Sequence, residues 1–412
     1  MIVYNVFFYN AKKAVRIIRS QGIIKGSKTV LTKIKKKNEM AVSKKDIFKF
    51  YHYLLLENRE ARISYQAKDE LRVAWFIPDF GIGSGGHLNI FRIIHLLETM
   101  GVYSDIYICG RSQWGDPGSV KEIINDNFFP LQSNIYIIEE NSEIGISYDA
   151  AIATSWQTAY YVRAFDNCVK KVYFVQDFEP YFYAQGSAYS FAEQTYKFGF
   201  YGITAGDWLK EKLEQEYGMI CESFSFSYEK DLYIQHGKRD KDVRRVFFYS
   251  RPPTDRRGFE LGVMALNEFC KKNPDVEVVM AGWDVSEYEI PFKHFNAGVV
   301  RIEELSHLYS QCDVSLILSF TNLSLLPLEL MASGCPVVIN KGKNNEWIDP
   351  DKKLFIYVDD NVQEIADVLD KVINMKIDTK TMLDNASEFL KNSSWEKESE
   401  KVKQYLFKII GD

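Results

Sequence analysis

Cysteine and histidine are scarce in this sequence, and neither is arranged as a metal or disulfide site. Six cysteines are scattered over 412 residues with no C-x-x-C pair. Isolated cysteines of this kind are typical of buried free thiols in a reducing compartment. No H-E-x-x-H run or Ser-His-Asp order is recognisable, which argues against a zinc hydrolase and a triad hydrolase. We therefore expect no metal site and no bound cofactor.

The sequence also lacks an apolar run long enough to cross a bilayer, which takes about 18–20 residues. The opening MIVYNVFFYN is apolar, but no basic stretch precedes it and no small-residue cleavage site follows it. We expect no signal peptide and predict a cytoplasmic protein. The hydrophobic content of 46% and the length of 412 residues favour two globular domains.

Acidic residues are nearly absent between residues 11 and 45. Glu39 is the only one there, against twelve lysines and arginines, so this segment carries a net charge of +11 while the whole chain carries −5. Apolar residues such as Val15, Ile17 and Ile18 are interspersed, and a basic amphipathic segment can lie on an anionic membrane surface. The alternative is a solvated helical arm, or one docked on the acidic remainder of the chain. No nucleic-acid motif accompanies the charge, so we expect no nucleic-acid partner.

Strand-like and helix-like segments alternate in two series, which predicts two doubly wound domains of parallel sheet facing across a cleft. The expected strands lie at residues 71–77, 104–110, 148–156 and 170–177, then at 246–250, 276–282, 313–319, 336–340 and 354–358. We assign residues 1–65 to a basic helical extension, 66–227 to a first Rossmann-like domain, 228–245 to a linker, 246–390 to a second Rossmann-like domain and 391–412 to a C-terminal helix. Ligands of such sheets bind at the carboxyl ends of the strands.

A single charge, Glu329, interrupts the apolar stretch TNLSLLPLELMASGCPVVIN that begins at Thr321. Pro327 is acceptable only in a first helical turn, so the helix is expected to start near residues 324–326. Its free N–H groups would then bind an anion, and Glu329, one turn on, would accept hydrogen bonds from a ribose. The alternative is a glutamate on the solvent side of the helix.

Three arginines, Arg251, Arg256 and Arg257, follow the first strand of the second domain in YSRPPTDRRGFE. Arginines before a helix suit phosphate oxygens, although a solvated loop would also explain them. In the first domain, GIGSGGH fits G-x-G-x-x-G through Gly81, Gly83 and Gly86, the dinucleotide fingerprint. The next strand ends in Arg111 rather than an acid, so an NADP enzyme stays open, as does a glycine loop that admits another substrate.

The run YFVQDFEPYFY places Gln176, Asp177 and Glu179 at the end of a first-domain strand, beside Tyr181. Carboxylates beside aromatic rings indicate a sugar-binding site, and structural aromatics under a loop are the alternative.

Together these motifs resemble the GT-B glycosyltransferases of family 4 over most of residues 70–410. ATSWQTAYYV, YFVQDFEPYFY and LSLLPLELMASGCPVV are more narrowly similar to the rhamnosyltransferases of bacterial surface-layer glycans. The resemblance implies retaining transfer of a hexose, with dTDP-L-rhamnose as donor, an oligosaccharide that is rhamnose-bearing and lipid-linked as acceptor, and no metal. It also implies that the C-terminal helix crosses back to the first domain.

The resemblance divides the candidate residues by role. Arg251, Arg257 and Asp177 would act in catalysis. The nucleotide-sugar would contact Gly85, Gly86, Arg251, Arg256, Arg257, Gly282, Arg301, Ile302, Asn322, Leu323, Ser324, Leu325 and Glu329. The acceptor would contact His87, Trp156, Gln176, Asp177, Glu179 and Tyr181.

One position departs from the family pattern E-x7-E, because its first glutamate falls at Thr321. This departure leaves open a non-catalytic subunit of glycan assembly. An oxidoreductase or sugar-nucleotide epimerase on a similar fold also stays open, on the glycine motif and Arg111.

Overall fold

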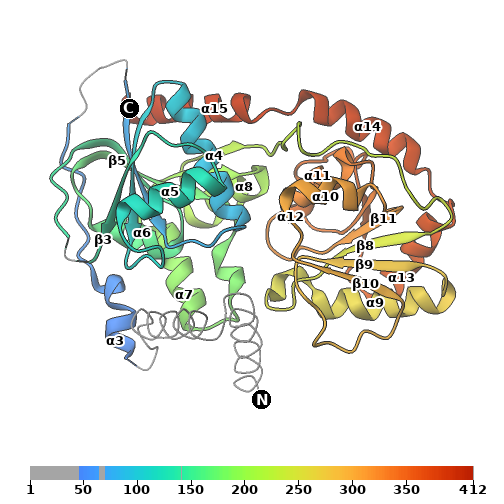
Figure 1. Ribbon diagram of the computed structural model, residues 1–412. Coiled ribbons are helices and arrows are strands. Elements are labelled where there is room, and N and C mark those ends of the chain that lie inside the picture. Colours follow the sequence, from blue (N-terminus) through green and yellow to red (C-terminus); the bar gives the residue numbers. More distant parts are fainter. Residues whose placement is uncertain (1–45, 65–69, 141, 412) are drawn as a thin grey trace, which may run out of the picture.

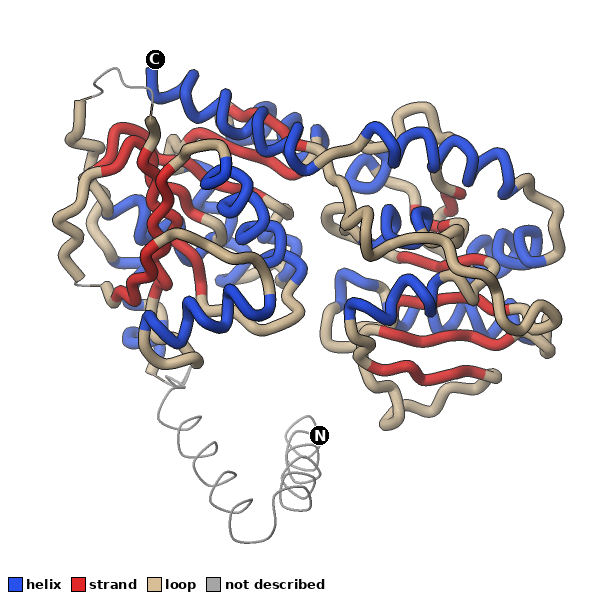
Figure 2. Tube along the Cα trace, turned by 45° about the horizontal axis from the view of Figure 1, so that its top comes forward, coloured by secondary structure: helices blue, strands red, loops and turns tan. Residues whose placement is uncertain are grey.

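Two all-parallel sheets, each flanked by helices, make two domains that lie side by side (Figures 1 and 2). The structure is a computed structural model that describes residues 46–64, 70–140 and 142–411. It confirms the predicted pair of doubly wound domains. The basic segment 11–45, for which the sequence leaves open membrane contact or a solvated or docked arm, lies outside the described residues.

The first domain is built on a seven-stranded sheet in the order β3-β2-β1-β4-β5-β6-β7. Its strands are β1 (Arg72–Pro78), β2 (Tyr103–Cys109), β3 (Asn134–Ile138), β4 (Tyr148–Ala153), β5 (Cys168–Val175), β6 (Tyr201–Ala205) and β7 (Cys221–Phe224). Its longer helices are α4 (Gly85–Thr99), α5 (Pro117–Asn127), α6 (Trp156–Ala164), α7 (Ser187–Gln194) and α8 (Asp207–Tyr217). The central strands are mostly apolar and are buried on both faces toward their carboxyl ends, as is usual in parallel sheets.

The second domain is built on a six-stranded sheet in the order β10-β9-β8-β11-β12-β13. Its strands are β8 (Arg245–Tyr249), β9 (Glu277–Ala281), β10 (His294–Gly298), β11 (Val314–Ile317), β12 (Val337–Asn340) and β13 (Ile356–Val358). Its helices are α9 (Phe259–Lys272), α10 (Ile302–Tyr309), α11 (Leu326–Ala332), α12 (Lys343–Glu346), α13 (Val362–Ile373) and α14 (Thr379–Asn392). In each sheet the strand order reverses beside the first strand, between β1 and β4 in one and between β8 and β11 in the other. The loops after these four strands therefore lie at the usual ligand-binding edge.

Four strands had not been predicted: β3, β6, β7 and β10. The strands β3, β7 and β10 lie at sheet edges, and β10 is a largely exposed HFNAG segment. An edge strand needs no continuous apolar run, so its sequence gives a weaker signal than that of a central strand. The strand β6 was hidden in an aromatic-rich region without a clear period.

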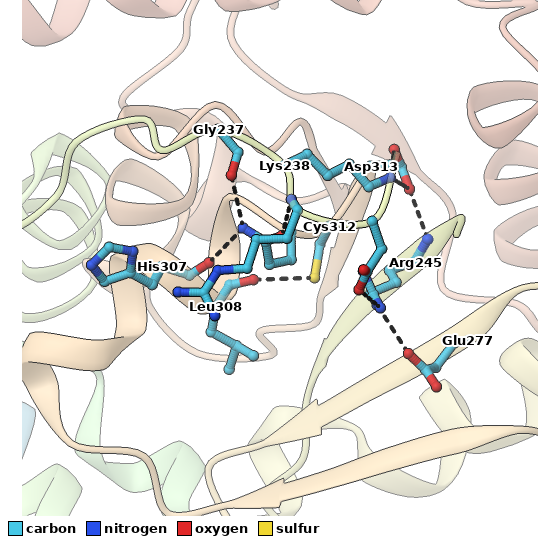
Figure 3. A network of polar contacts seen from close by, with 11 residues as sticks. Gly237, Lys238, Arg245, Glu277, His307, Leu308, Cys312 and Asp313 are labelled. Atoms are coloured by element: carbon cyan, nitrogen blue, oxygen red, sulfur yellow. Dashed lines mark hydrogen bonds and ion pairs between the residues drawn. The ribbon is translucent and has the colours of Figure 1, made fainter. Parts of the chain in front are cut away.

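The linker after β7 is attached to the second domain by a polar network (Figure 3). Nζ of Lys238 lies 2.6 Å from Oδ1 of Asp313, and the N–H of Arg245 donates to Oδ2 of the same carboxylate at 2.7 Å. The guanidinium of Arg245 also donates to Glu277 at 2.9 Å. Because Asp313 directly precedes β11, these bonds fix the linker at the amino end of the second sheet.

A second crossover returns the chain to the first domain through α15 (Trp395–Gly411), which packs against α4 and β7 (Figure 1). At its start Trp395 lies under the guanidinium of Arg92, with 4.3 Å from Cζ to the ring centroid. Arg92 also donates to Glu229 of the linker at 2.7 Å. One buried arginine of α4 therefore contacts both crossovers.

The segment before β1 is docked on the first domain. It contains α3 (Ile47–Phe50) and the short 3-10 helix η1 (His52–Leu55). Arg163 donates to the carbonyls of Leu54 and Leu56 at 3.1 and 2.6 Å. These contacts hold the segment against α6.

Candidate functional site

The side chain of Asp177, two residues after the end of β5, reaches across to the second domain. Its Oδ1 accepts the backbone N–H of Asn322 at 2.8 Å, and its Oδ2 accepts the hydroxyl of Thr321 at 2.9 Å. Nε of Arg256 lies 3.7 Å from Oδ2. Burial raises the pKa of Asp177 above its ordinary value, and the two arginines Arg256 and Arg257 act in the opposite direction.

Asn322 is the other half of this interdomain contact and is only 1% exposed. Its Nδ2 donates to the carbonyls of Gln176 and Ala205 at 3.0 and 2.8 Å. Its Oδ1 accepts the indole N–H of Trp347 at 3.0 Å. Both ends of the amide are used, so the loop after β11 is fixed against the ends of β5 and β6.

The two adjacent arginines take different directions. Both belong to the short 3-10 helix η4 (Asp255–Arg257). Arg256 turns to the first domain, where its Cζ lies 4.2 Å over the ring of Phe182. Arg257 stays in the second domain and donates to Oγ of Ser319 at 2.8 Å. Burial lowers the pKa of Arg257, as does the charge of Arg256.

Arg251 is half-buried at the start of the same loop. Its carbonyl accepts the N–H of Thr254 at 2.9 Å, which turns the chain toward η4. Its charge acts on Arg257 in the same direction as that of Arg256. The three arginines therefore form one positive group after β8, as the sequence predicted.

The backbone N–H groups before α11 are only partly available to a ligand. Leu323 requires a correction, because its N–H already donates to the carbonyl of Asn344 at 3.0 Å and to Oδ1 of Asn322 at 2.9 Å. Its side chain is 3% exposed. No acceptor in the described ranges takes the N–H of Ser324 or Leu325. Those two groups, rather than three, are open at this point.

Glu329 lies in the first half of α11 and is not a solvent-facing residue. Burial raises its pKa to about 7, and the nearby hydroxyl of Tyr233, from the linker, acts in the opposite direction. Arg92 opposes that rise through its charge. The carboxylate thus sits between the linker and the first domain, where its ionisation is sensitive to pH near neutrality.

The glycine-rich loop enters α4 beside these groups. Gly85 and Gly86 are exposed, and a Cβ at Gly85 would meet open space. Nε2 of Gln176 donates to the carbonyl of Gly86 at 3.0 Å, which ties this loop to the end of β5. Nδ1 of His87 lies 2.8 Å from Oγ of Ser84, and burial lowers the pKa of His87 to about 4. The imidazole is therefore neutral at pH 7.

The predicted base-binding residues lie at the ends of β9 and β10. Gly282 has φ +109°, and its N–H donates to the carbonyl of Gly298 at 2.8 Å. Ile302 is 39% exposed at the start of α10. The guanidinium of Arg301 is exposed and paired with Glu304 at 2.8 Å.

Two predicted acceptor residues require correction, Trp156 and Glu179. Trp156 is 4% exposed and packs on Tyr53 of the docked segment, with ring centroids 6.0 Å apart. Both oxygens of Glu179 are engaged: Oε1 accepts the hydroxyl of Tyr173 at 2.9 Å, and Oε2 accepts the N–H of Trp156 at 3.0 Å. Burial raises the pKa of Glu179 to about 7. These residues support the loop from beneath, while Tyr181 is exposed.

Three residues of the site had not been singled out from the sequence: Arg92, Tyr233 and Trp347. Each is embedded in an ordinary helical or linker segment. The only sequence signal was the asparagine-rich NKGKNNEW run before Trp347, whose Asn340, Asn344 and Asn345 donate to the carbonyl of Ser319 at 3.0 Å each.

Two searches of the described residues gave negative results. Within residues 46–64, 70–140 and 142–411, no group of three or more His, Cys, Asp or Glu side chains is placed to hold a metal ion. No helix in these ranges has the length and apolar character needed to span a bilayer.

Two family models match the chain. "WsaF, N-terminal domain" matches residues 139–204, and "WsaF, C-terminal domain" matches residues 244–370. A curated relative, "O-antigen biosynthesis protein RfbC" of Myxococcus xanthus, is 33% identical over 355 residues, which is 84% of this chain. The chain spans only 28% of the length of that relative.

The fold is that of known glycosyltransferase structures. The sucrose-phosphate synthase of Thermosynechococcus elongatus has a TM-score of 0.62 at 12% identity, covering 83% of this chain and 99% of that chain. WaaG, described as a glycosyltransferase involved in lipopolysaccharide biosynthesis, has a TM-score of 0.58 at 13% identity, covering 81% and 99%. Anabaena Alr3699/HepE in complex with UDP and glucose has a TM-score of 0.58 at 14% identity, covering 83% and 99%. The chain therefore has the GT-B fold, and two of its segments match the N-terminal and C-terminal domains of the WsaF family.

Proposed function

We propose that the protein is a retaining glycosyltransferase that moves a sugar from a nucleoside diphosphate onto a growing glycan. The observation that carries this proposal is the group of Arg251, Arg256 and Arg257 after β8, next to the loop after β11 and facing Asp177 across the domain boundary. Positive charge fixed at this point stabilises the diphosphate as it leaves, which is commonly the largest catalytic contribution.

The donor would lie mainly on the second domain. The diphosphate would bind the three arginines of the loop after β8 and the backbone N–H groups of Asn322, Ser324 and Leu325. The ribose would bind the carboxylate of Glu329, and the base would lie against Gly282 and the backbone at residues 301–302. These arginines supply the positive charge that other enzymes obtain from a metal, so we propose a reaction that needs no metal ion.

The acceptor would approach from the first domain, past Gly86, Gln176 and Tyr181. No carboxylate is assigned as a nucleophile. Retention of configuration would then result from attack on the same face of the sugar from which the diphosphate leaves. An oxygen of the departing phosphate takes the proton of the acceptor hydroxyl, and Asp177 orients that hydroxyl.

For the donor we propose dTDP-L-rhamnose. The support is the match to both WsaF models and the resemblance of the motifs around Trp156, Asp177 and Glu329 to rhamnosyltransferases. Thr321 in place of a glutamate is compatible with a sugar that lacks the 6-hydroxyl. Binding of dTDP-glucose and dTDP-rhamnose with equal affinity would reject this assignment.

For the acceptor we propose a rhamnose-containing, lipid-linked surface glycan. The name of the relative RfbC, an O-antigen biosynthesis protein, supports a surface polysaccharide. A lipid-linked acceptor would be met at the inner face of the cell membrane, and the +11 charge of residues 11–45 supports peripheral contact there.

The deciding experiment is calorimetric binding of dTDP, UDP, GDP and NADPH to the wild type and to Glu329→Ala. We expect dTDP to bind best and the variant to weaken it about 10-fold or more, because hydrogen bonds to a charged group contribute about 1.5–3 kcal/mol. Preference for NADPH would instead support the oxidoreductase or epimerase that Arg111 leaves open. Nucleotide binding without donor hydrolysis, and without transfer to a synthetic rhamnoside, would indicate a non-catalytic subunit.

A further inference from the structure

The carboxylate of Asp177 is held by donors of the kind that hold a phosphate. A backbone N–H (Asn322), a hydroxyl (Thr321) and a guanidinium (Arg256) converge on its two oxygens at 2.8, 2.9 and 3.7 Å. Backbone amides and arginines are the usual ligands of phosphate oxygens. Two of the three donors lie in the loop after β11, and the third lies in the arginine loop after β8.

These donors belong to the second domain, whereas Asp177 belongs to the first. The contact is sheltered, since the side chain of Asp177 is 13% exposed and that of Arg256 is 26% exposed. Thr321 and Asn322 are buried. An anion that enters between the two loops must therefore meet the position that Asp177 already occupies.

We infer that the carboxylate of Asp177 and the donor's diphosphate compete for one anion-binding position, formed by Thr321, Asn322 and Arg256. The carboxylate occupies this position until the diphosphate displaces it. This inference rests on the proposed function. It goes beyond that function because it assigns Asp177 a second role before the acceptor arrives.

An order of binding follows. While Asp177 is bonded to Thr321 and Asn322, one lone pair of each oxygen is committed to the second domain. Displacement by the diphosphate frees the carboxylate on the acceptor side of the sugar. The donor must then bind first, because only its arrival releases the residue that orients the acceptor hydroxyl.

The test compares the affinity of dTDP and of thymidine, measured by calorimetry, in the wild type and three variants. Asp177→Ala removes the competing carboxylate, and Thr321→Val removes one of its donors without a change in charge. Asp255→Asn is the matched control, since it removes an exposed charge next to Arg256 without touching the loop after β11. Thymidine lacks the phosphates and reports the base and ribose contacts alone.

We expect Asp177→Ala to bind dTDP about 10-fold more tightly than the wild type. This factor applies if Asp177 occupies the position in about nine-tenths of the wild-type molecules, so that only about one-tenth can bind dTDP. Thr321→Val should not gain affinity in this way, because the hydroxyl that it removes would bind the diphosphate as well as Asp177. Asp255→Asn should match the wild type, and all four proteins should bind thymidine equally.

Three results would overturn the inference while leaving the proposed function intact. One is unchanged or weaker dTDP binding in Asp177→Ala. Another is an equal gain in dTDP affinity in Asp255→Asn, which would show that the gain comes from the loss of any negative charge and not from Asp177. The third is acceptor binding before donor in the kinetics of the wild type. Absence of any nucleoside diphosphate binding in the wild type would instead remove the proposed function.

Discussion

The indole of Trp347 lies directly against Gly206, across the boundary between the two domains. A Cβ at Gly206 would lie 2.5 Å from Cε2 of the indole, well inside contact distance, and the residue has φ +88°. The same indole donates to Oδ1 of Asn322 at 3.0 Å. Packing at the end of β6 therefore controls the position of the loop that carries Thr321 and Asn322.

Gly206→Ala should push the indole away and separate the two domains at this point. We expect a loss of about 1–3 kcal/mol in stability from overpacking, with further strain from the positive φ. Nucleotide affinity should fall as well, because Asn322 loses a partner that fixes its loop. Thermal unfolding and dTDP calorimetry measure the two effects.

The double variant Gly206→Ala with Trp347→Ala is the control, because it removes the ring that clashes. It should regain part of the nucleotide affinity lost in Gly206→Ala alone. The prediction is wrong if the single variant binds dTDP like the wild type, since the domain contact would then not influence the loop.

Breaking the ion pair between Arg92 and Glu229 should cost different amounts of stability, depending on which partner is removed. The side chain of Arg92 is 3% exposed, whereas that of Glu229 is 35% exposed. Glu229→Ala removes the hydrogen-bonded counter-ion of a buried cation and leaves only the more distant charge of Glu329, which costs about 3 kcal/mol. Arg92→Met leaves a carboxylate that water can reach, and it should cost at least 1 kcal/mol less, of about the same order as an ordinary core substitution.

Urea denaturation of both variants measures this difference. The double variant Arg92→Met with Glu229→Ala should unfold at nearly the same urea concentration as Arg92→Met, because no buried charge is left unpaired. Equal midpoints for the two single variants would contradict the burial difference and would assign the stabilisation to the stack of Arg92 on Trp395 instead.

The sequence predicted the position of several residues correctly, because those positions depend only on where strands end. Gln176 and Asp177 were expected at the carboxyl end of a strand, and Arg251 at the end of another, because a parallel sheet brings such ends to one edge. The pattern of apolar runs also identified every central strand of the second sheet. These are local properties, and local sequence encodes them.

The failures concern side-chain direction. Nothing near Trp156 in the sequence indicates that residues 46–64 cover it, and Glu179 is turned inward by Tyr173 and the start of α6. Leu323 follows the predicted anion-binding pattern, but the amide of Asn322 and the carbonyl of Asn344 take its N–H. Such choices depend on contacts between segments far apart in the chain.

Donor binding should weaken at acid pH if Glu329 holds the ribose. Burial raises the pKa of Glu329 to about 7, so the carboxylate gains a proton as the pH falls through 7 and loses its ability to accept two hydroxyls. We expect the Kd for dTDP to rise between pH 8 and pH 6, approaching about 10-fold per pH unit below the pKa. Calorimetry across this range measures it.

Two variants separate Glu329 from other titrating groups. Glu329→Gln should bind dTDP weakly and with no such pH dependence. Glu179→Gln removes a second carboxyl whose pKa burial raises to about 7 but whose oxygens accept from Tyr173 and the N–H of Trp156 in the first domain. Glu179→Gln should keep the pH dependence of the wild type. Loss of that dependence in Glu179→Gln would show that Glu179, and not Glu329, is the titrating group.

Contact with an anionic bilayer should involve the docked segment as well as the basic residues before it. Ile47, Phe48 and Leu55 are 62, 81 and 69% exposed, and they follow directly on the +11 segment 11–45. Charge would attract the protein to the surface, and apolar side chains would insert into it. The double variant Ile47→Ser with Phe48→Ser should therefore bind phosphatidylglycerol vesicles about 100-fold or more less tightly in a sedimentation assay, since each buried side chain contributes about 1.5–3 kcal/mol and about 1.4 kcal/mol is a factor of ten.

The control is Met264→Ser, which changes another exposed apolar residue (54%), in α9 of the second domain. It should sediment like the wild type. Binding should also weaken with added salt and be absent with phosphatidylcholine, because the Debye length falls to about 3 Å at 1 M ionic strength. If Met264→Ser and the double variant lose binding equally, vesicle binding depends on surface hydrophobicity in general and not on this segment. If neither variant nor salt changes binding, the basic segment does not direct the protein to anionic lipid.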